Sequence, residues 1–198
     1  MLRFRLFRGL MGALFAALLG AASPAHGSIV QALSLAELVE HADCIALGRV
    51  LFSESFQQPG GQIGTWYRVR VERDLGGNAP DTEVIVETLG GRIGNVAMQV
   101  EGEPSFSVGE RVIVFLRGGG PYTAFRAVGM GQGVMRVRNE GGIETVTQSR
   151  QGMMLVRRSS DGYLQKSLGA LPTAERLEDF LKSVRAIVEQ QEGEGHRE

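Results

Sequence analysis

Acidic side chains are the most numerous groups in this chain that could do chemistry. Glu101 and Glu103 flank Gly102 in a turn-rich segment, and Glu110 follows a short distance along the chain. Two carboxylates at a suitable separation could hydrolyse a glycoside, or could hold Ca²⁺ together with backbone oxygens. The segment lacks the ligand spacing of an EF-hand. We therefore expect these acids to lie on solvated loops, with calcium binding and catalysis as the alternatives.

Histidine and cysteine offer a smaller set of options. A structural zinc site needs about four Cys or His ligands, whereas the whole chain has three His and one Cys. We expect His41 to be a partly exposed residue at a helix end, where the helix dipole favours a cation. Cys44 lies in an apolar run and is expected to be a small buried hydrophobe. A nucleophile assisted by His41 and an intermolecular disulfide are the alternatives, and we predict no metal and no cofactor.

Two glycine-rich motifs resemble phosphate-binding loops without their context. The run of residues 90–94, Gly-Gly-Arg-Ile-Gly, is not followed by Gly-Lys-Ser/Thr and lies between expected strands. The run of residues 129–133 contains only the weak Gly-x-Gly-x-Gly pattern. We expect both to form turns or bulges between neighbouring strands.

The most informative binding signal is a row of side chains in the second expected strand. Apolar and polar residues alternate over residues 65–75, as is typical of a half-buried strand. Trp66, Arg68 and Arg70 then stand about 6–7 Å apart on the outward face. An aromatic ring beside two guanidinium groups could stack on a sugar or clamp acidic groups. We take these three as candidate ligand-binding residues, the alternative being a solvated face on which Glu72 balances the arginines.

Short strands joined by glycine-rich turns must position these groups. The expected strands cover residues 44–52, 65–75, 83–89, 96–101, 111–117, 122–128, 133–138, 143–147 and 153–157. Residues 111–117 are the most apolar, so we expect a central strand that is covered on both faces. The 28 glycines fit tight turns and barrel corners. We predict a mainly β protein built as a small, closed, antiparallel barrel of OB-like or netrin-like type.

Two helices are expected to flank this barrel. Ser34 and Glu37 have the spacing of a capping box, which predicts a two-turn helix ending near Ala42. Thr173 is a plausible N-cap for a long amphipathic helix near the C-terminus. The apolar residues of that helix recur at helical spacing and comprise Leu177, Phe180, Leu181, Val184, Ile187 and Val188. We expect this stripe to pack on the barrel, with a partner or a second copy as the alternative.

The N-terminus has the pattern of a cleaved signal peptide, residues 1–27. Arg3, Arg5 and Arg8 precede an apolar stretch of 14 residues, 9–22, and small residues follow. A membrane-spanning helix needs roughly 20 apolar residues, and no later segment of the sequence is long enough. We therefore predict export to the periplasm or the extracellular space. The expected organisation is a β-barrel domain over residues 28–170, a helix over 171–192 and a disordered tail over 193–198.

Charge and size limit the partners of the exported chain. Removal of the leader leaves 18 Lys+Arg against 22 Asp+Glu, a formal charge of −4. This balance argues against nucleic acid and against an anionic membrane surface as targets. The remaining 171 residues suffice to bury a core without a metal or a disulfide. A protein or polysaccharide of the cell envelope is the expected partner.

Several runs resemble those of a family of exported bacterial proteins of unknown function. They cover about residues 34–138 in order, and the final helix is also similar. The runs are residues 42–50 (Ala-Asp-Cys-Ile-Ala-Leu-Gly-Arg-Val), 66–69 (Trp-Tyr-Arg-Val), 90–94, 102–106, 109–112 and 131–133.

The opening of the first run also resembles the start of netrin-like domains, among them the N-terminal domain of tissue inhibitors of metalloproteinases. This resemblance implies a five-stranded OB-like barrel with flanking helices. Those inhibitors act through an N-terminal cysteine held by disulfides, and the exported chain has no cysteine at its start. The inhibitory wedge is therefore not carried over, and fold likeness alone licenses no activity.

These observations predict an exported, non-catalytic binding module that contacts a protein or a glycan through Trp66, Arg68 and Arg70. A protease-inhibitor-like protein that uses loops at one barrel end is the first alternative. An uncharacterised hydrolase that uses the acids of residues 101–110 is the second.

Overall fold

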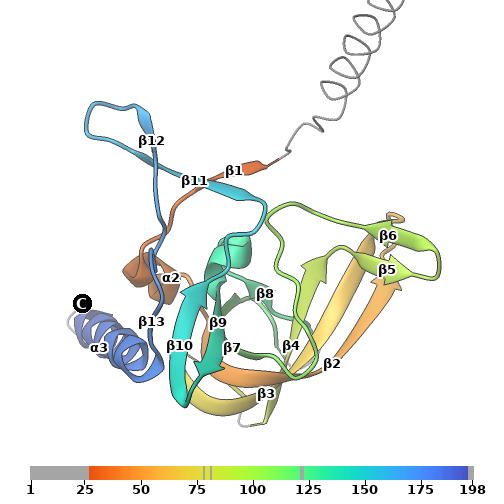
Figure 1. Ribbon diagram of the computed structural model, residues 1–198, viewed down its shortest axis with the longest axis horizontal. Coiled ribbons are helices and arrows are strands. Elements are labelled where there is room, and N and C mark those ends of the chain that lie inside the picture. The colour runs from red at the N-terminus through yellow and green to blue at the C-terminus, as the bar shows by residue number, and fades with distance from the viewer. Residues whose placement is uncertain (1–26, 78, 81, 121–122, 196–198) are drawn as a thin grey trace, which may run out of the picture.

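A computed structural model describes residues 27–77, 79–80, 82–120 and 123–195 of the 198-residue chain. The predicted signal peptide lies outside the described residues, apart from Gly27. The described part is mainly β, as the sequence predicts, and its strands form one large sheet and two small ones (Figure 1). The large sheet has the order β13 (Glu175–Arg176), β10 (Ile143–Gln148), β9 (Val134–Glu140), β7 (Arg111–Arg117), β2 (Cys44–Gln57), β3 (Ile63–Gly77), β4 (Glu83–Leu89), with β8 (Arg126–Ala127) paired to β7.

Strand β7 separates two apolar cores, which explains its continuous apolar sequence. Ile113 and Phe115 point into one core, beneath the helices, and Val112, Val114 and Leu116 point into the other, inside the curved sheet. All five side chains are fully buried. A strand that is covered on both faces cannot alternate between apolar and polar residues. The prediction of a central, doubly covered strand is therefore confirmed.

The expectation of a closed barrel is wrong. Within the described residues the sheet path ends at β13 on one side and at β4 on the other, and these end strands do not pair. Strand β4 meets the segment before β8 at one parallel bridge, between Val86 and Phe125. Two backbone hydrogen bonds of 2.8 Å, from Phe125 to Ile85 and from Glu87 to Phe125, join these segments. Phe125 alone therefore connects this segment to β4, and the two do not form a regular ladder of paired residues.

Strands β2 and β3 are longer than the sequence pattern predicts. Residues 53–57 and 63–64, expected to lie in a loop, continue the β2–β3 ladder, so the loop covers only residues 58–62. Three register shifts in β2 change which side chains face outward along the strand. The pair consequently curves from the core to a distal end, where β5 (Gly91–Ile93) and β6 (Val96–Met98) form a small hairpin.

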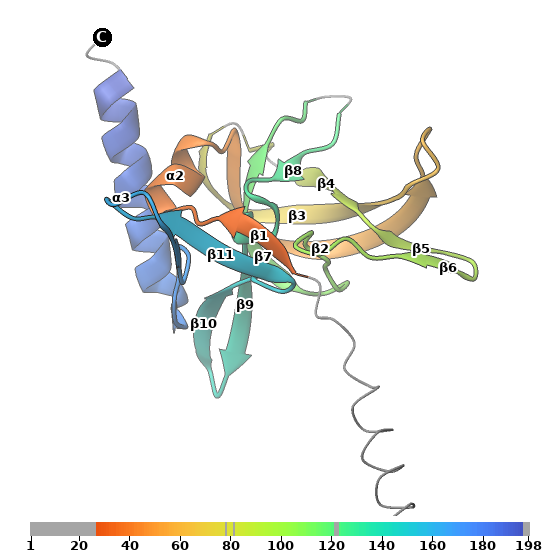
Figure 2. The ribbon, with the colours of Figure 1, turned by 90° about the horizontal axis from the view of Figure 1, so that it is seen from above.

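Two helices cover the core at the opposite end from this hairpin (Figures 1 and 2). Helix α2 (Leu35–Glu40) begins with the predicted capping box of Ser34 and Glu37. Helix α3 (Leu177–Gly195) begins after β13 rather than after Thr173, and it extends to Gly195. Its residues Leu177, Phe180, Leu181 and Val184 are buried in the core, and Ile187 and Val188 pack against it. The predicted apolar stripe therefore packs on the sheet.

A three-stranded sheet stands apart from the large one, and two of its strands, β1 (Ser28–Gln31) and β12 (Leu164–Lys166), were not indicated by the sequence pattern. In it, β11 (Met153–Arg158) pairs in parallel with β1 and antiparallel with β12. Figure 2 shows β1 crossing the body of the molecule beside β11.

Both apolar cores are built from residues between Leu33 and Val188. A chain that lacks residues 1–26 therefore retains every residue of both cores.

Candidate functional site

The outward face of β3 presents two of the predicted binding residues to a groove. Trp66 is 41% exposed, and Arg68 and Arg70 are exposed, whereas Tyr67 and Val69 between them are buried. Trp66 and Arg68 line an open groove of about 630 Å³ on the outer side of β2, β3 and β4. Arg70 stands farther along the strand and does not line it. The structure thus brings together two of the three predicted residues.

An aromatic stack forms one wall of this site. The ring of Phe56 lies on that of Trp66, with centroids 4.0 Å apart and an interplanar angle of 25°. Gly64 makes the stack possible, because a Cβ there would come within 2.8 Å of the Phe56 ring. Residues 53–57 resemble a loop in sequence, so the sequence pattern missed this phenylalanine.

Glu87 on β4 is the polar centre of the groove. Its Oε2 accepts a hydrogen bond from Trp66 Nε1 at 3.0 Å, and its Oε1 accepts from Arg126 Nη2 at 2.7 Å and from Gln58 Nε2 at 3.2 Å. The carboxylate therefore fixes the indole edge and draws a cation to the same place. The alternation of residues 83–89 sets Glu87 on the opposite face of the strand from Val84 and Val86, but the sequence does not show which side chains meet it.

Apolar side chains and a loosely paired cation complete the groove. Phe52 and Ile85 line it while remaining 47% and 39% exposed. The guanidinium of Arg68 stands 5.6 Å from the Phe52 ring centroid, within the range of a cation–π contact. Its Nε lies 3.6 Å from Glu83, and half of its side chain is exposed. Glu72, the expected counter-charge of the row, pairs instead with Arg49 and Arg111.

The acids proposed for catalysis do not form one cluster of three. Glu101 and Glu103 line a separate hollow of about 530 Å³ beside β5 and β6. The Glu103 carboxylate accepts from the Leu89 amide at 3.2 Å, and that of Glu101 accepts from Gln99 Nε2 at 3.0 Å. Glu110 lies elsewhere, paired with Arg136. Within the described residues, no group of three or more His, Cys, Asp or Glu side chains could hold a metal ion.

Cys44 and His41 take the structural roles that the sequence predicts. Cys44 is fully buried, and this desolvation, reinforced by Asp74 and Asp43, raises the pKa of its thiol to about 12. A thiol that is buried and protonated at neutral pH is neither a nucleophile nor available for an intermolecular disulfide. His41 is exposed at the C-terminal end of α2.

The two glycine motifs lie in different structures. Gly91–Ile93 form strand β5 instead of the expected turn or bulge, because they pair with β6. Met130–Gly133 form a single 3₁₀ turn between strands, as expected. Gly133 allows a close approach, since a Cβ there would lie 2.5 Å from the Val128 carbonyl oxygen.

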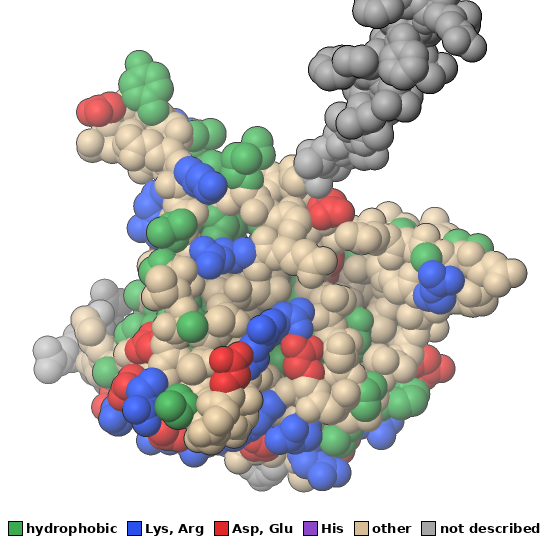
Figure 3. All heavy atoms as spheres, in the orientation of Figure 1, with side chains coloured by type: hydrophobic (Ala, Val, Ile, Leu, Met, Phe, Trp, Pro, Cys, Tyr) green, Lys and Arg blue, Asp and Glu red, His purple; other side chains and the backbone are tan. Residues whose placement is uncertain are grey.

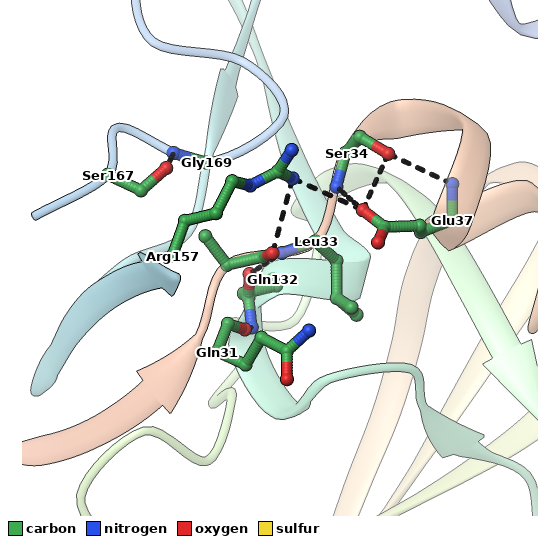
Figure 4. Close-up of polar contacts among 9 residues, drawn as sticks. Gln31, Leu33, Ser34, Glu37, Gln132, Arg157, Ser167 and Gly169 are labelled. Carbon is green, nitrogen blue, oxygen red and sulfur yellow. Dashed lines mark hydrogen bonds and ion pairs between the residues drawn. The ribbon is translucent and has the colours of Figure 1, made fainter. Parts of the chain in front are cut away.

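A second polar cluster surrounds Gln132, whose own side chain is closed to solvent. Gln132 is fully buried; its Oε1 accepts from the Leu33 amide at 2.9 Å, and its Nε2 donates to the Gln31 carbonyl at 3.0 Å. Figure 4 shows these contacts beside the Ser34–Glu37 capping box, with Arg157 reaching Glu37 at 3.2 Å. The cluster holds the N-terminal segment against the body of the molecule.

No protein-family model matches this chain, and no curated protein matches it significantly. Across the part of the chain that the structure describes, no helix has both the length and the apolar character needed to cross a membrane.

Proposed function

We propose that this chain is an exported, non-catalytic binding protein of the cell envelope that holds a protein or glycan ligand on the outer face of β2, β3 and β4. The observation that carries the proposal is the groove itself. Phe52, Trp66 and Ile85 are each 39–47% exposed and line one groove, together with charged groups. Apolar residues that gather on a surface in this way mark interaction sites more often than residues scattered singly.

The groove is organised before any ligand arrives. Phe56 stacks on the face of the Trp66 ring, and Glu87 accepts a hydrogen bond from the N–H of that ring. A side chain that is already ordered loses less conformational entropy on binding, which favours affinity. The tip of Arg126 meets Glu87, yet 59% of its side chain is exposed, as is 50% of that of Arg68. Both cations are therefore accessible to an acidic group of a ligand.

The OB-like or netrin-like class is part of the same proposal. Strands β7, β2, β3 and β4 follow one another around the curved sheet, and Phe125 bridges back to β4. OB-folds are five-stranded, partly open barrels that bind ligands on their second and third strands. This arrangement supports the likeness, and under it β3 and β4 would correspond to the second and third strands of such a barrel.

Protease inhibition and hydrolysis stay predictions of the sequence. A hydrolase would start from Glu101 and Glu103, because they share a hollow. Both carboxylates accept hydrogen bonds from neighbouring groups of the chain, which is an ordinary structural role. The outer groove has the more specific geometry, so we prefer binding.

Capture experiments with a matched pair of double variants test the proposal. Immobilised chain from residue 27 onward is exposed to soluble envelope extract and to a glycan array. We expect Trp66→Ala with Arg68→Ala to lose at least about tenfold in captured ligand, because interface aromatic and arginine side chains dominate binding energy. The control is Ile143→Ala with Arg138→Ala on the distant β9–β10 hairpin, where both residues are exposed. If the groove variant captures the same ligands as the wild type while remaining folded, the proposal fails.

A further inference from the structure

The β1–β11–β12 sheet exposes an apolar outer face. Cross-strand register places Ile29 beside Met154, and Leu164 beside Arg158, on the side away from the buried Leu155. Ile29 is 68%, Met154 51% and Leu164 62% exposed. Tyr163 at the hairpin turn and Leu168 after β12 are exposed by 74% and 58%. Five of the large apolar side chains exposed in the described structure thus gather on this sheet and its flanks.

The same hairpin is basic, although the exported chain as a whole is acidic. Residues 150–168 contain four Lys or Arg and one acid, Asp161, on a chain whose formal charge after residue 27 is −4. Arg157 turns inward to Glu37. Arg158 and Lys166 lie on the apolar outer face by register, and both are exposed. Figure 3 shows hydrophobic and basic side chains gathered on this protruding hairpin.

We propose that this outer face docks on a membrane surface rich in anionic phospholipid, with Tyr163 and Leu164 entering the headgroup boundary. Apolar side chains flanked by Lys and Arg are the pattern of proteins that lie on such surfaces, and tyrosine is enriched at this depth of the bilayer. The local charge complements the lipid and outweighs the negative sum over the chain, because surface electrostatics fade beyond about 8 Å at physiological salt.

The position of the chain's N-terminal segment favours a membrane over another occupant. The apolar residues 9–22 lie outside the described residues, and five residues separate them from β1, where the Ser28 amide donates to the Gly152 carbonyl at 3.0 Å, just before β11. Until the predicted signal peptide is cleaved, a membrane that receives those apolar residues would therefore be brought next to this face. The inference does not rest on the ligand groove, which belongs to a different sheet.

Vesicle sedimentation tests the electrostatic half of the proposal. Chain from residue 27 onward is mixed with vesicles of phosphatidylethanolamine and phosphatidylglycerol, or of phosphatidylcholine alone. We expect sedimentation with the anionic vesicles, weakened by salt and reduced roughly fivefold for each cation removed in Arg158→Gln with Lys166→Gln. The matched control, Lys182→Gln with Arg185→Gln on the exposed side of α3, removes the same charge elsewhere. Equal binding to both lipids, equal loss in the control or no sedimentation would overturn the proposal.

A fluorescent label tests the insertion half. In Leu164→Cys an environment-sensitive dye can be attached selectively, because Cys44 is fully buried. We expect its emission to shift to the blue on anionic vesicles, while the same dye on Ile143→Cys, at the exposed tip of the β9–β10 hairpin, does not shift. A shift at both positions overturns the proposal. A blue shift that grows with protein concentration in the absence of vesicles also overturns the proposal, since it would assign this face to contact with a second copy of the chain. Loss of vesicle binding in Trp66→Ala with Arg68→Ala overturns it as well.

Discussion

Two polar centres of this molecule make similar numbers of hydrogen bonds to different kinds of partner. Gln132 is fully buried and reaches backbone atoms of Gln31, Leu33 and Gly129. Glu87 lies in an open groove and accepts from the side chains of Trp66, Arg126 and Gln58. Gln132 therefore fixes the position of the backbone, and Glu87 fixes the orientation of the side chains that line the groove.

This difference separates groups that maintain the fold from groups that are free to recognise a ligand. A buried amide that holds backbone atoms has no alternative partner, so its loss leaves unsatisfied groups inside the protein. Glu87 is only partly exposed, but the cation beside it, Arg126, is largely exposed and can turn to water, or to a ligand, at modest cost. We therefore expect changes at Gln132 to reduce stability and changes at Glu87 to reduce binding.

The largest effect is expected from Gln132→Leu. This substitution keeps the volume but leaves the Leu33 amide and the Gln31 carbonyl without their partner. An unsatisfied buried group costs about 1–3 kcal/mol, so we expect the free energy of unfolding to fall by about 3 kcal/mol in urea titrations.

The neighbouring Gln31→Ala is the control for this change. Gln31 contributes its backbone carbonyl to the cluster while its own side chain position is exposed. Surface substitutions of this kind change stability by less than about 0.5 kcal/mol. If both variants lose the same stability, Gln132 does not hold the N-terminal segment in the way described.

Glu87→Gln is expected to have the next largest effect, and on binding rather than on stability. The neutral amide no longer attracts the Arg126 guanidinium, and its contact with the Trp66 N–H weakens. Hydrogen bonds to charged groups contribute about 1.5–3 kcal/mol, which corresponds to a loss of about tenfold or more in affinity for the captured ligand.

Trp66 provides a direct measurement, since it is the one tryptophan of the chain. The fluorescence emission of Trp66 should differ between Glu87→Gln and the wild type. In Glu87→Gln, addition of the captured ligand should change this emission less than it does in the wild type. Glu140→Gln, at an exposed position on β9, removes the same charge away from the groove. Equal affinities for the two variants would contradict the role assigned to Glu87.

The regular elements could be predicted from sequence because each has a local physical signal. Alternation gives β4 over residues 83–89, and the continuous apolar run gives β7 over 111–117, both with the observed bounds. The Ser34–Glu37 spacing predicts the capping box. These signals depend on neighbours within a few residues, so one sequence suffices to find them.

The parts that were missed depend on contacts between distant residues. Strand β1 pairs with β11, more than 120 residues away, and four residues of alternating exposure give little local signal. The bulges of β2 and its extension through residues 53–57 bring Phe56 onto Trp66, which no local pattern indicates. Trp66 and Arg68 were therefore predictable as an outward row, whereas their partners Phe56, Glu87 and Arg126 were not.

Ser34→Ala is expected to have a smaller effect than Gln132→Leu in the same region. Loss of an N-cap hydroxyl costs about 1 kcal/mol. The hydrogen bonds from the Ser34 hydroxyl and amide hold the pKa of Glu37 below its ordinary value of 4.5, and the charge of Arg157 adds to this.

A lowered carboxyl pKa in the folded state makes part of the stability depend on pH. That part is fully present above the unfolded-state pKa and is lost as pH falls from there through the folded-state value. Urea titrations at neutral pH and at pH values below 4.5 should therefore show a smaller acid-induced loss in Ser34→Ala than in the wild type. An identical pH dependence would show that Ser34 does not control the ionisation of Glu37.

The smallest change in stability is expected from Gly64→Ala, which acts on the groove alone. The added methyl would meet the far end of the Phe56 ring at 2.8 Å, and that ring can turn away at little cost. We expect the free energy of unfolding to change by less than about 0.5 kcal/mol, while Trp66 loses its stacked neighbour and its emission changes. Gly60→Ala in the adjacent loop, where a Cβ meets nothing within 4 Å, should leave that emission unaltered. Because the substitution removes no polar group, a fall in ligand affinity in Gly64→Ala would assign part of recognition to the aromatic stack itself, separately from the charge of Glu87.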